Sequence, residues 1–392
     1  MLFLLLSLTF LPESPANAKN FNHYNNWLKK DLFIKLSGYF DTPFLKEIML
    51  NARINNIEYE ELNKIMQLLR IKDFSFPEEY FNERRLKVRI SIAKKLKQKY
   101  HDVLSEIEKV YQVPTNILLS IWGTESDFGK AKLKFLTLKA LTFQVYKGER
   151  EKYFFTELLE FLKVIKDGKL PYKNLFSSHL GAMGQPQFMP SSYNKLGIDF
   201  DLDGKVDIWN NVKDTLASIA NFLKSNGWES DLDWGYEISN SSNFPCYMEG
   251  PDNIKAISFW EKSGVNIIYN DRFKNLPPQT LTSLFYPKGE YGPKFLVTKN
   301  FYVLKKYNNS DLYALYVGHL SDKISKKNNS SEFSWKQTDP ISREKVLGIQ
   351  QQLISNGFDV GNFDGLIGYK TRRSIGLLQE KNNAMITCFP NK

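Results

Sequence analysis

Residues 178–193 read SHLGAMGQPQFMPSSY, and the fold of the chain is best decided from this stretch. Gly181 and Gly184 permit tight turns, because a residue without a Cβ adopts backbone angles that other residues adopt only at a cost. Ser178 and Gln187 add a hydroxyl and an amide, which commonly bond to the backbone of such turns. The stretch predicts a turn-rich loop, and local turn bonding is one of two interpretations of both polar side chains; the other is a contact with a ligand.

A carboxylate, Glu125, stands upstream of this stretch, where an apolar helix is predicted to end. The helix is expected to begin near Pro114, since proline tolerates the first helical position. One buried face is predicted from the spacing of Ile117, Leu118, Ile121 and Trp122. Desolvation beside that face would raise the pKa of the carboxyl group, and a protonated acid can donate to a leaving-group oxygen. A solvated glutamate at a helix end is the simpler alternative.

Length and composition favour a multidomain globular protein with an anionic partner. The chain has 392 residues, of which 42% are hydrophobic, and this suits two or three domains. Its net charge of +10 suits nucleic acid, anionic lipid or an acidic wall polymer. The densest basic stretch, residues 84–99, has helical apolar spacing and no interleaved aromatic block, so we expect no nucleic-acid partner.

Several common chemistries have no motif in this sequence. Cys246 and Cys388 are too few for a disulfide framework, and their separation gives no pairing signal. The four histidines form no metal signature, and the HExxH, GxSxG, Walker and GxGxxG patterns are absent. We therefore expect neither a serine or zinc hydrolase nor a required cofactor.

The N-terminus resembles an export signal. Residues 2–11 are mostly apolar, and Ala16-Asn17-Ala18 is a small-x-small cleavage site, so residues 1–18 are predicted to be a signal peptide. The apolar run is short for a bilayer span, although an uncleaved anchor is the alternative. The segment before the run lacks Lys and Arg, which departs from the usual pattern. The prediction is a soluble, exported protein of the periplasm.

The rest of the chain divides into a long helical part and a small C-terminal part. Amphipathic helices are predicted over residues 86–110, 152–166, 215–224 and 311–324. A small β-containing insertion is predicted between residues 235 and 305, with apolar runs at 281–286 and 294–298. Residues 325–340 have the polar composition of a linker, and a compact module is expected at 341–385. Its second helix is predicted to start near Thr371.

Three separated blocks together resemble the membrane-bound lytic murein transglycosylase B family of exported enzymes. They are residues 125–129, 178–193 and 307–314, and residues 291–295 are also similar. The resemblance covers roughly residues 21–324. It implies a mainly α (α+β) structure, namely a lysozyme-like catalytic domain over 19–324 that carries the small β-containing insertion.

The family's chemistry needs a single carboxyl group. Such enzymes cleave the β-1,4 bond between N-acetylmuramic acid (MurNAc) and N-acetylglucosamine (GlcNAc) without water. Glycosidases ordinarily use two carboxyl groups, the second as a nucleophile or as a base for water. Here the C6 hydroxyl of MurNAc closes a 1,6-anhydro ring, so one glutamate serves as acid and then as base.

The resemblance assigns roles to individual residues. Glu125 matches the catalytic position, whereas Asp127 is expected to cap a turn or face solvent. The implied substrate-binding residues are Ser178, Gln187, Tyr307, Asn308, Tyr313 and Arg150. Two positions depart from the family pattern: Phe222 stands where a tyrosine is common, and Glu151 stands where a second arginine is common.

A possible structural calcium site is suggested by an acidic loop. Asp199, Asp201 and Asp203 precede Gly204 with the spacing of an EF-hand-type loop. Some members of the family bind Ca²⁺ in this region, and Asp214 could close a longer loop. A solvated acidic turn is the equal alternative.

The module at 341–385 resembles the three-helix peptidoglycan-binding domain and is expected to be a small helical domain. The resemblance rests on residues 346–353, 357–358, 361–365, Gly368 and Thr371. A module that no longer binds glycan is the alternative. The implied partners are peptidoglycan glycan strands, with peripheral association with membrane or wall machinery left open, and we expect a monomer. Two other functions compete: a muramidase that hydrolyses the same bond, and a non-catalytic wall-binding protein.

Overall fold

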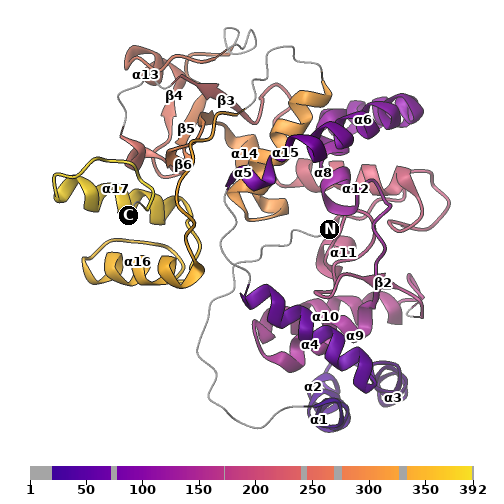
Figure 1. The fold of residues 1–392 in the computed structure, drawn as a ribbon. Coiled ribbons are helices and arrows are strands. Elements are labelled where there is room, and N and C mark those ends of the chain that lie inside the picture. Colours follow the sequence, from indigo (N-terminus) through magenta and orange to yellow (C-terminus); the bar gives the residue numbers. More distant parts are fainter. Residues whose placement is uncertain are drawn as a thin grey trace. The chain divides into compact units, whose positions relative to one another are not determined.

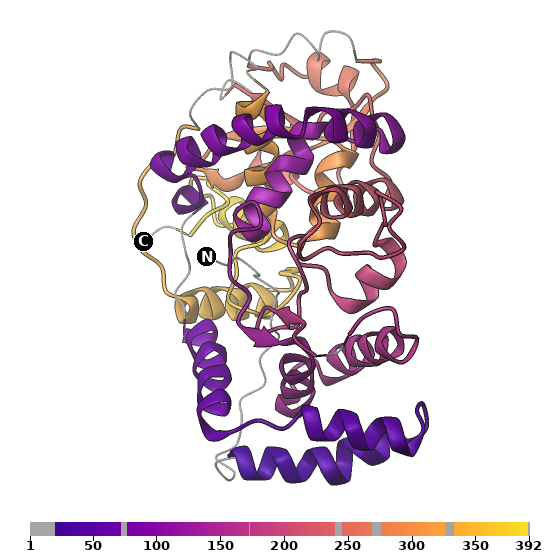
Figure 2. The same ribbon diagram turned by 90° about the vertical axis from the view of Figure 1, so that its right-hand side faces the viewer.

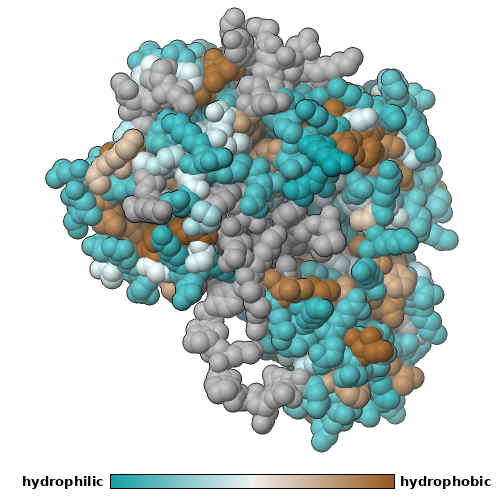
Figure 3. Space-filling view, in the orientation of Figure 1, coloured by the Kyte–Doolittle hydropathy of each residue, from teal (hydrophilic) through white to brown (hydrophobic). Residues whose placement is uncertain are grey.

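The computed structural model describes residues 20–71, 77–171, 173–239, 245–268, 276–325 and 333–390. The predicted signal peptide, 1–18, lies outside them. The described residues divide into two compact units, one of 20–71 with 122–222 and one of 77–121 with 223–390. No helix in the described ranges has the length and apolar character needed to cross a membrane. Hydrophilic residues cover most of the coloured surface in Figure 3.

The first unit is mainly helical (Figures 1 and 2), and its described residues include a two-stranded sheet. Its helices are α1 (Phe21–Trp27), η1 (Leu28–Leu32), α2 (Phe33–Leu36), α3 (Thr42–Asn51), α4 (Asn56–Ile71), α9 (Thr137–Lys147), α10 (Glu151–Lys166) and α11 (Pro190–Leu196). Helix α9 packs against α10, and nearly all of its residues are buried, so it forms the centre of this unit. Strands β1 (Phe135–Leu136) and β2 (Phe176–Ser177) pair antiparallel. This pairing sets Leu175 beside the start of α9, where its carbonyl accepts the N–H of Thr137 at 2.9 Å, and the 178–193 stretch follows directly after β2.

Two helices cross the boundary between the units, α8 (Thr115–Ser126) and α12 (Val212–Ser225). The second unit contains the sheet of the insertion, which is antiparallel with strand order β3-β7-β5-β4. Its strands are β3 (Gly235–Ile238), β4 (Lys255–Ala256), β5 (Leu281–Phe285) and β7 (Lys294–Val297), with β6 (Pro287–Glu290) between β5 and β7 in the chain. The predicted β-containing insertion is therefore present.

Along the chain, the helices of the second unit come before, between and after the strands of this sheet. They are α5 (Pro77–Tyr80), α6 (Glu83–Lys99), α7 (His101–Tyr111), η2 (Cys246–Met248), α13 (Ile257–Lys262), α14 (Lys299–Tyr307), α15 (Asp311–Ile324), α16 (Arg343–Ser355) and α17 (Tyr369–Lys381). The helix predicted over 86–110 is in fact two, because Tyr100 leaves the helical region at φ −109° and ψ 26°. The N–H of Tyr100 still bonds to Leu96 and its carbonyl to Leu104, so the apolar spacing runs across the break.

The C-terminal module is joined covalently to the insertion. Cys246 in η2 forms a disulfide with Cys388, beyond α17, although the sequence carried no signal for this pairing. The described part of the predicted linker is also anchored, since the N–H of Lys336 donates to the carbonyl of Tyr291 at 2.8 Å. Disulfides are typical of oxidising, extracytoplasmic compartments.

Candidate functional site

Glu125 lies half-buried in the last turn of α8, and an unusual backbone follows it. Asp127, Phe128 and Gly129 are all left-handed, with φ of 49°, 58° and 79°. Such angles are uncommon for residues other than glycine, and they cluster where a structure holds a functional group in place. The Phe128 ring folds back onto Gly123, where a Cβ would lie 2.5 Å from it. The helix end that carries Glu125 is therefore tightly defined.

Gln185 connects this helix end to the 178–193 stretch. The indole N–H of Trp122 donates to Gln185 Oε1 at 2.7 Å, and Gln185 Nε2 donates to the carbonyl of Trp209 at 2.9 Å. The backbone N–H of Gln185 also donates to the carbonyl of Ile208 at 2.8 Å. Our sequence reasoning missed Gln185; the paired glutamines of the Gly-Gln-Pro-Gln run were the available signal.

The predicted turns of the 178–193 stretch are present. Met183 and Phe188 exchange backbone hydrogen bonds of 2.7 and 3.0 Å, which close a tight hairpin. Gln187 sits in this hairpin at φ 54°, and its Nε2 donates to the carbonyl of Gly184 at 2.7 Å. Among the described residues, Gln187 Oε1 has no hydrogen-bond partner although it is buried. An unsatisfied buried acceptor is costly, so this oxygen is suited to a donor from a ligand or water.

Ser178 is buried and serves the turn. Its hydroxyl oxygen accepts the N–H groups of Leu180 at 3.3 Å and Ala182 at 3.1 Å. These contacts correspond to local turn bonding, which is the alternative interpretation of Ser178 from the sequence. Its predicted contact with substrate is untested by this geometry and remains a prediction.

A second carboxylate of the first unit, Glu157 in α10, is buried but engaged. Its oxygens accept the N–H of Ser191 at 2.9 Å and the hydroxyl of Ser191 at 2.8 Å. Burial raises the pKa of Glu157, and the two bonds from Ser191 oppose the shift. Asp127, by contrast, is exposed. Glu157 therefore stabilises the start of α11, which leaves it poorly suited to act as a base for water.

Arg150 is the N-cap of α10 and lies half-buried at φ 58°. Its guanidinium stands 4.3 Å from the centre of the Tyr153 ring. Glu151, the departure from the family pattern, forms an ion pair with Lys35. The predicted contact of Arg150 with the glycan's peptide remains a prediction.

The remaining predicted binding residues gather in the second unit, at the turn between α14 and α15. The rings of Tyr307 and Tyr313 are nearly parallel, with centroids 6.4 Å apart and an interplanar angle of 11°. Asn308 Oδ1 accepts the N–H of Ser310 at 3.2 Å, and the Ser310 hydroxyl accepts the N–H of Tyr313 at 3.3 Å. The turn thus holds two aromatic rings and an amide in one defined arrangement.

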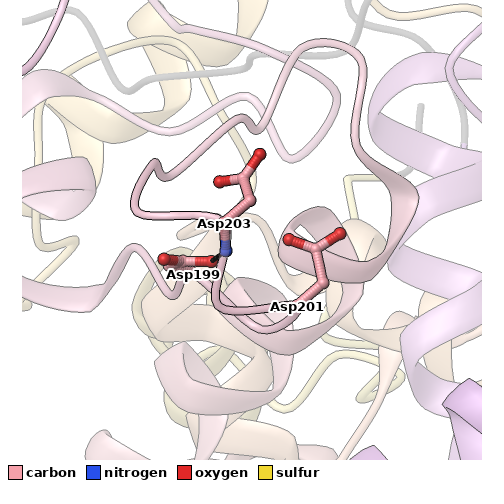
Figure 4. A group of neighbouring side chains, drawn as sticks. All are labelled: Asp199, Asp201 and Asp203. Carbon is pink, nitrogen blue, oxygen red and sulfur yellow. Dashed lines mark hydrogen bonds between the residues drawn. The ribbon is translucent and has the colours of Figure 1, made fainter.

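The acidic loop brings three of its four predicted ligands together, as Figure 4 shows. Carboxylate oxygens of Asp199, Asp201 and Asp203 all lie within 4.8 Å of one another. The fourth, Asp214, is buried and accepts the N–H groups of Phe200 at 2.9 Å and Asp207 at 2.8 Å. The Asp214 carboxylate thus stabilises the loop by accepting hydrogen bonds from the loop's backbone.

Comparison with known proteins identifies the family. Residues 45–322, well over half of the chain, match the model described as Transglycosylase SLT domain. The chain belongs to this family. The family predicted from the three blocks is thereby confirmed.

Individual relatives support this family assignment. The chain is 32% identical over 231 residues to membrane-bound lytic murein transglycosylase B of Escherichia coli (strain K12), covering 57% of this chain and 61% of that protein. The match therefore spans about three fifths of this curated relative. SltB3 from Pseudomonas aeruginosa is 29% identical, covering 95% of this chain and 98% of that one. Its complexes with NAG-NAM-pentapeptide and NAG-anhNAM-pentapeptide superpose with TM-scores of 0.81 and 0.80.

A more distant structure shares the fold. Escherichia coli Slt35 in complex with calcium is 23% identical, with a TM-score of 0.58 over 83% of this chain and 98% of that one. The predicted class, a mainly α lysozyme-like fold with small antiparallel sheets, is confirmed by the SltB3 likeness. The exact domain limits remain predictions.

Proposed function

We propose that this protein is a lytic transglycosylase of peptidoglycan, which cleaves the MurNAc-β-1,4-GlcNAc bond and leaves 1,6-anhydro-MurNAc ends. The observation that carries the proposal is the family match over residues 45–322, which includes Glu125 in the last turn of α8. The complex of the relative SltB3 with NAG-anhNAM-pentapeptide, a ligand with such an anhydro sugar, supports it.

In this mechanism the carboxyl group of Glu125 acts twice. It first donates its proton to the glycosidic oxygen, and the bond from that oxygen to C1 of MurNAc breaks. The resulting carboxylate then takes the proton of the C6 hydroxyl as O6 forms a bond to C1. The carboxyl group is regenerated, no water is consumed and no cofactor is required.

We assign substrate-binding roles within each unit separately. In the first unit, Oε1 of Gln187 has no hydrogen-bond partner among the described residues and is suited to accept a hydrogen bond from a sugar hydroxyl or amide. In the second unit, Tyr307 and Tyr313 would pack on sugar rings and Asn308 would bond an N-acetyl group. Arg150 would meet the carboxylates of stem peptides, and Ser178 would keep the loop in shape.

A calcium ion fits the acidic loop as a structural element. Three carboxylates converge there, and Gly204 provides the left-handed turn, at φ 89°, on which such loops depend. Asp199, Asp201 and Asp203 would hold the ion, and Asp214 would stabilise the loop through its hydrogen bonds to the loop's backbone. The calcium complex of the relative Slt35 is consistent with this assignment.

We place the enzyme in the periplasm as a monomer that acts on glycan strands. The disulfide between Cys246 and Cys388 supports an oxidising compartment. The excess of Lys and Arg suits a wall polymer that carries carboxylates.

The test is turnover of purified sacculi by the wild type, Glu125→Gln and Asp127→Asn. Loss of a group that serves as both acid and base should lower the rate by about a thousandfold or more. Asp127→Asn should keep nearly full activity, because Asp127 is exposed and asparagine tolerates its left-handed backbone. Release of fragments by Glu125→Gln at the wild-type rate would refute the role of Glu125.

A further inference from the structure

Arg372, in the C-terminal module, is buried and pairs with two carboxylates outside that module. It lies on α17 and is 2% exposed. Its Nε and Nη2 donate to the two carboxylate oxygens of Glu249 at 2.7 and 2.9 Å. Nη1 donates to the carbonyl of Ile367 at 2.9 Å. A bidentate arginine–carboxylate pair is a strong and geometrically specific contact.

The same guanidinium reaches the turn that carries the predicted sugar-binding residues. Arg372 Nη2 also donates to Asp311 Oδ2 at 3.2 Å, and Asp311 is the first residue of α15. Lys305, in the last turn of α14, donates to the other oxygen of Asp311 at 2.5 Å. Asp311 therefore ties α14, α15 and α17 together, two residues before Tyr313 and three after Asn308.

Further contacts hold the C-terminal module in place around this clamp. The disulfide joins Cys388 to Cys246, three residues before Glu249. Glu380 on α17 accepts the hydroxyl of Tyr247 at 2.6 Å. The backbone N–H of Glu290 donates to the carbonyl of Thr387 at 2.9 Å. The module is thus fixed to the insertion by covalent, ionic and backbone contacts.

We propose that Arg372 is a positioning residue for the Tyr307–Asn308–Tyr313 surface. The C-terminal module would then support the proposed sugar-binding surface of the catalytic domain, in addition to any binding of peptidoglycan by the module itself. This inference rests on the proposed function, because that surface is assigned there to the sugar. Arg372 does not touch substrate in this proposal. It acts through Asp311, whose placement sets the turn between α14 and α15.

An arginine is required at this position by geometry as much as by charge. A planar guanidinium can meet both oxygens of Glu249 and one oxygen of Asp311 at once. A lysine ammonium is a point charge that cannot reproduce this fork. Arg372→Lys therefore keeps the charge while it removes the coupling between Glu249 and Asp311.

The experiment compares steady-state kinetics of the wild type, Arg372→Lys and Arg373→Lys on soluble, uncross-linked peptidoglycan chains. Arg373 is the matched control, because it lies on the same helix and pairs with Asp252 at a more exposed site. Arg372→Lys should raise KM at least fivefold and change kcat less than twofold. Arg373→Lys should leave both parameters within twofold of the wild type.

The split between KM and kcat separates positioning from a merely structural role. A variant that only folds less completely lowers the concentration of active enzyme, so apparent kcat falls and KM stays constant. That result, or an unchanged KM, would overturn the proposal. Should Arg372→Lys fail to fold, Asp311→Asn tests the same contact and should raise KM in the same way. A wild type that neither binds nor cleaves these chains would instead refute the proposed function.

Discussion

Removal of the disulfide between Cys246 and Cys388 should destabilise the second unit strongly. The bond closes a loop with a sequence separation of 142 residues. Restricting the unfolded chain by such a loop contributes up to about 5 kcal/mol in the chain-entropy model. Both cysteines are fully buried in a cluster with Trp260, Leu284 and Leu296, so a Cys246→Ala, Cys388→Ala variant also loses packing. We expect a loss of about 3–5 kcal/mol in the free energy of unfolding.

Urea denaturation measures this loss through tryptophan fluorescence, with limited proteolysis to report on release of the C-terminal module. The double variant should unfold at a lower urea concentration and should be cut between the insertion and α16 before the wild type is. The wild type in reductant is the control: it should resist reduction while folded, because both sulfurs are inaccessible. An unchanged midpoint together with unchanged proteolysis would refute the view that this bond fixes the module.

Three further predictions concern the first unit and the helix of the module. Gly184→Ala should lower the free energy of unfolding by about 2 kcal/mol or more in thermal denaturation, because φ is +62° and the new Cβ would lie 2.6 Å from the carbonyl oxygen of Ile208. Gly348→Ala is the control: beyond its chain neighbours and its own helix backbone, no atom of the described residues lies within 4 Å of its new Cβ, so this change should stabilise the protein or leave its stability unchanged. Calcium should raise the unfolding midpoint of the wild type but not of Asp203→Asn, and equal responses would exclude this loop as the site. Burial lowers the pKa of His179 to about 4, so between pH 6.5 and pH 4 the unfolded state binds a proton that the folded state does not. The free energy of unfolding should therefore fall by about 2 kcal/mol between pH 7 and pH 5. His179→Gln should flatten this dependence, and an equally steep fall in that variant would contradict the assignment.

Local pattern predicted much of the fold. The helix expected near Pro114 begins at Thr115, and the helix predicted over 311–324 has those bounds in the structure. Apolar runs at 281–286 and 294–298 correspond to β5 and β7. These elements are recoverable because burial of one face imposes a period on the sequence. The break at Tyr100 could not be predicted in this way, because the apolar spacing continues across it.

Long-range contacts were beyond such reasoning. The Cys246–Cys388 bond and the Arg372–Glu249 pair join residues separated by 142 and 123 positions, and no periodicity encodes either. Gln185 was overlooked because its role depends on the Trp122 indole, which only the folded chain brings near. Glu125 itself was found through its chemistry and the resemblance, and the structure adds the strained backbone that follows it.

The central claim is that one carboxyl group cleaves the glycan without water, and mass spectrometry of the products tests it directly. Purified sacculi are digested by the wild type in water enriched in oxygen-18, with Glu125→Gln as the blank. The account predicts 1,6-anhydro-MurNAc ends, one water lighter than reducing ends and free of the heavy isotope. Reducing MurNAc ends that carry oxygen-18 would show hydrolysis and contradict the account.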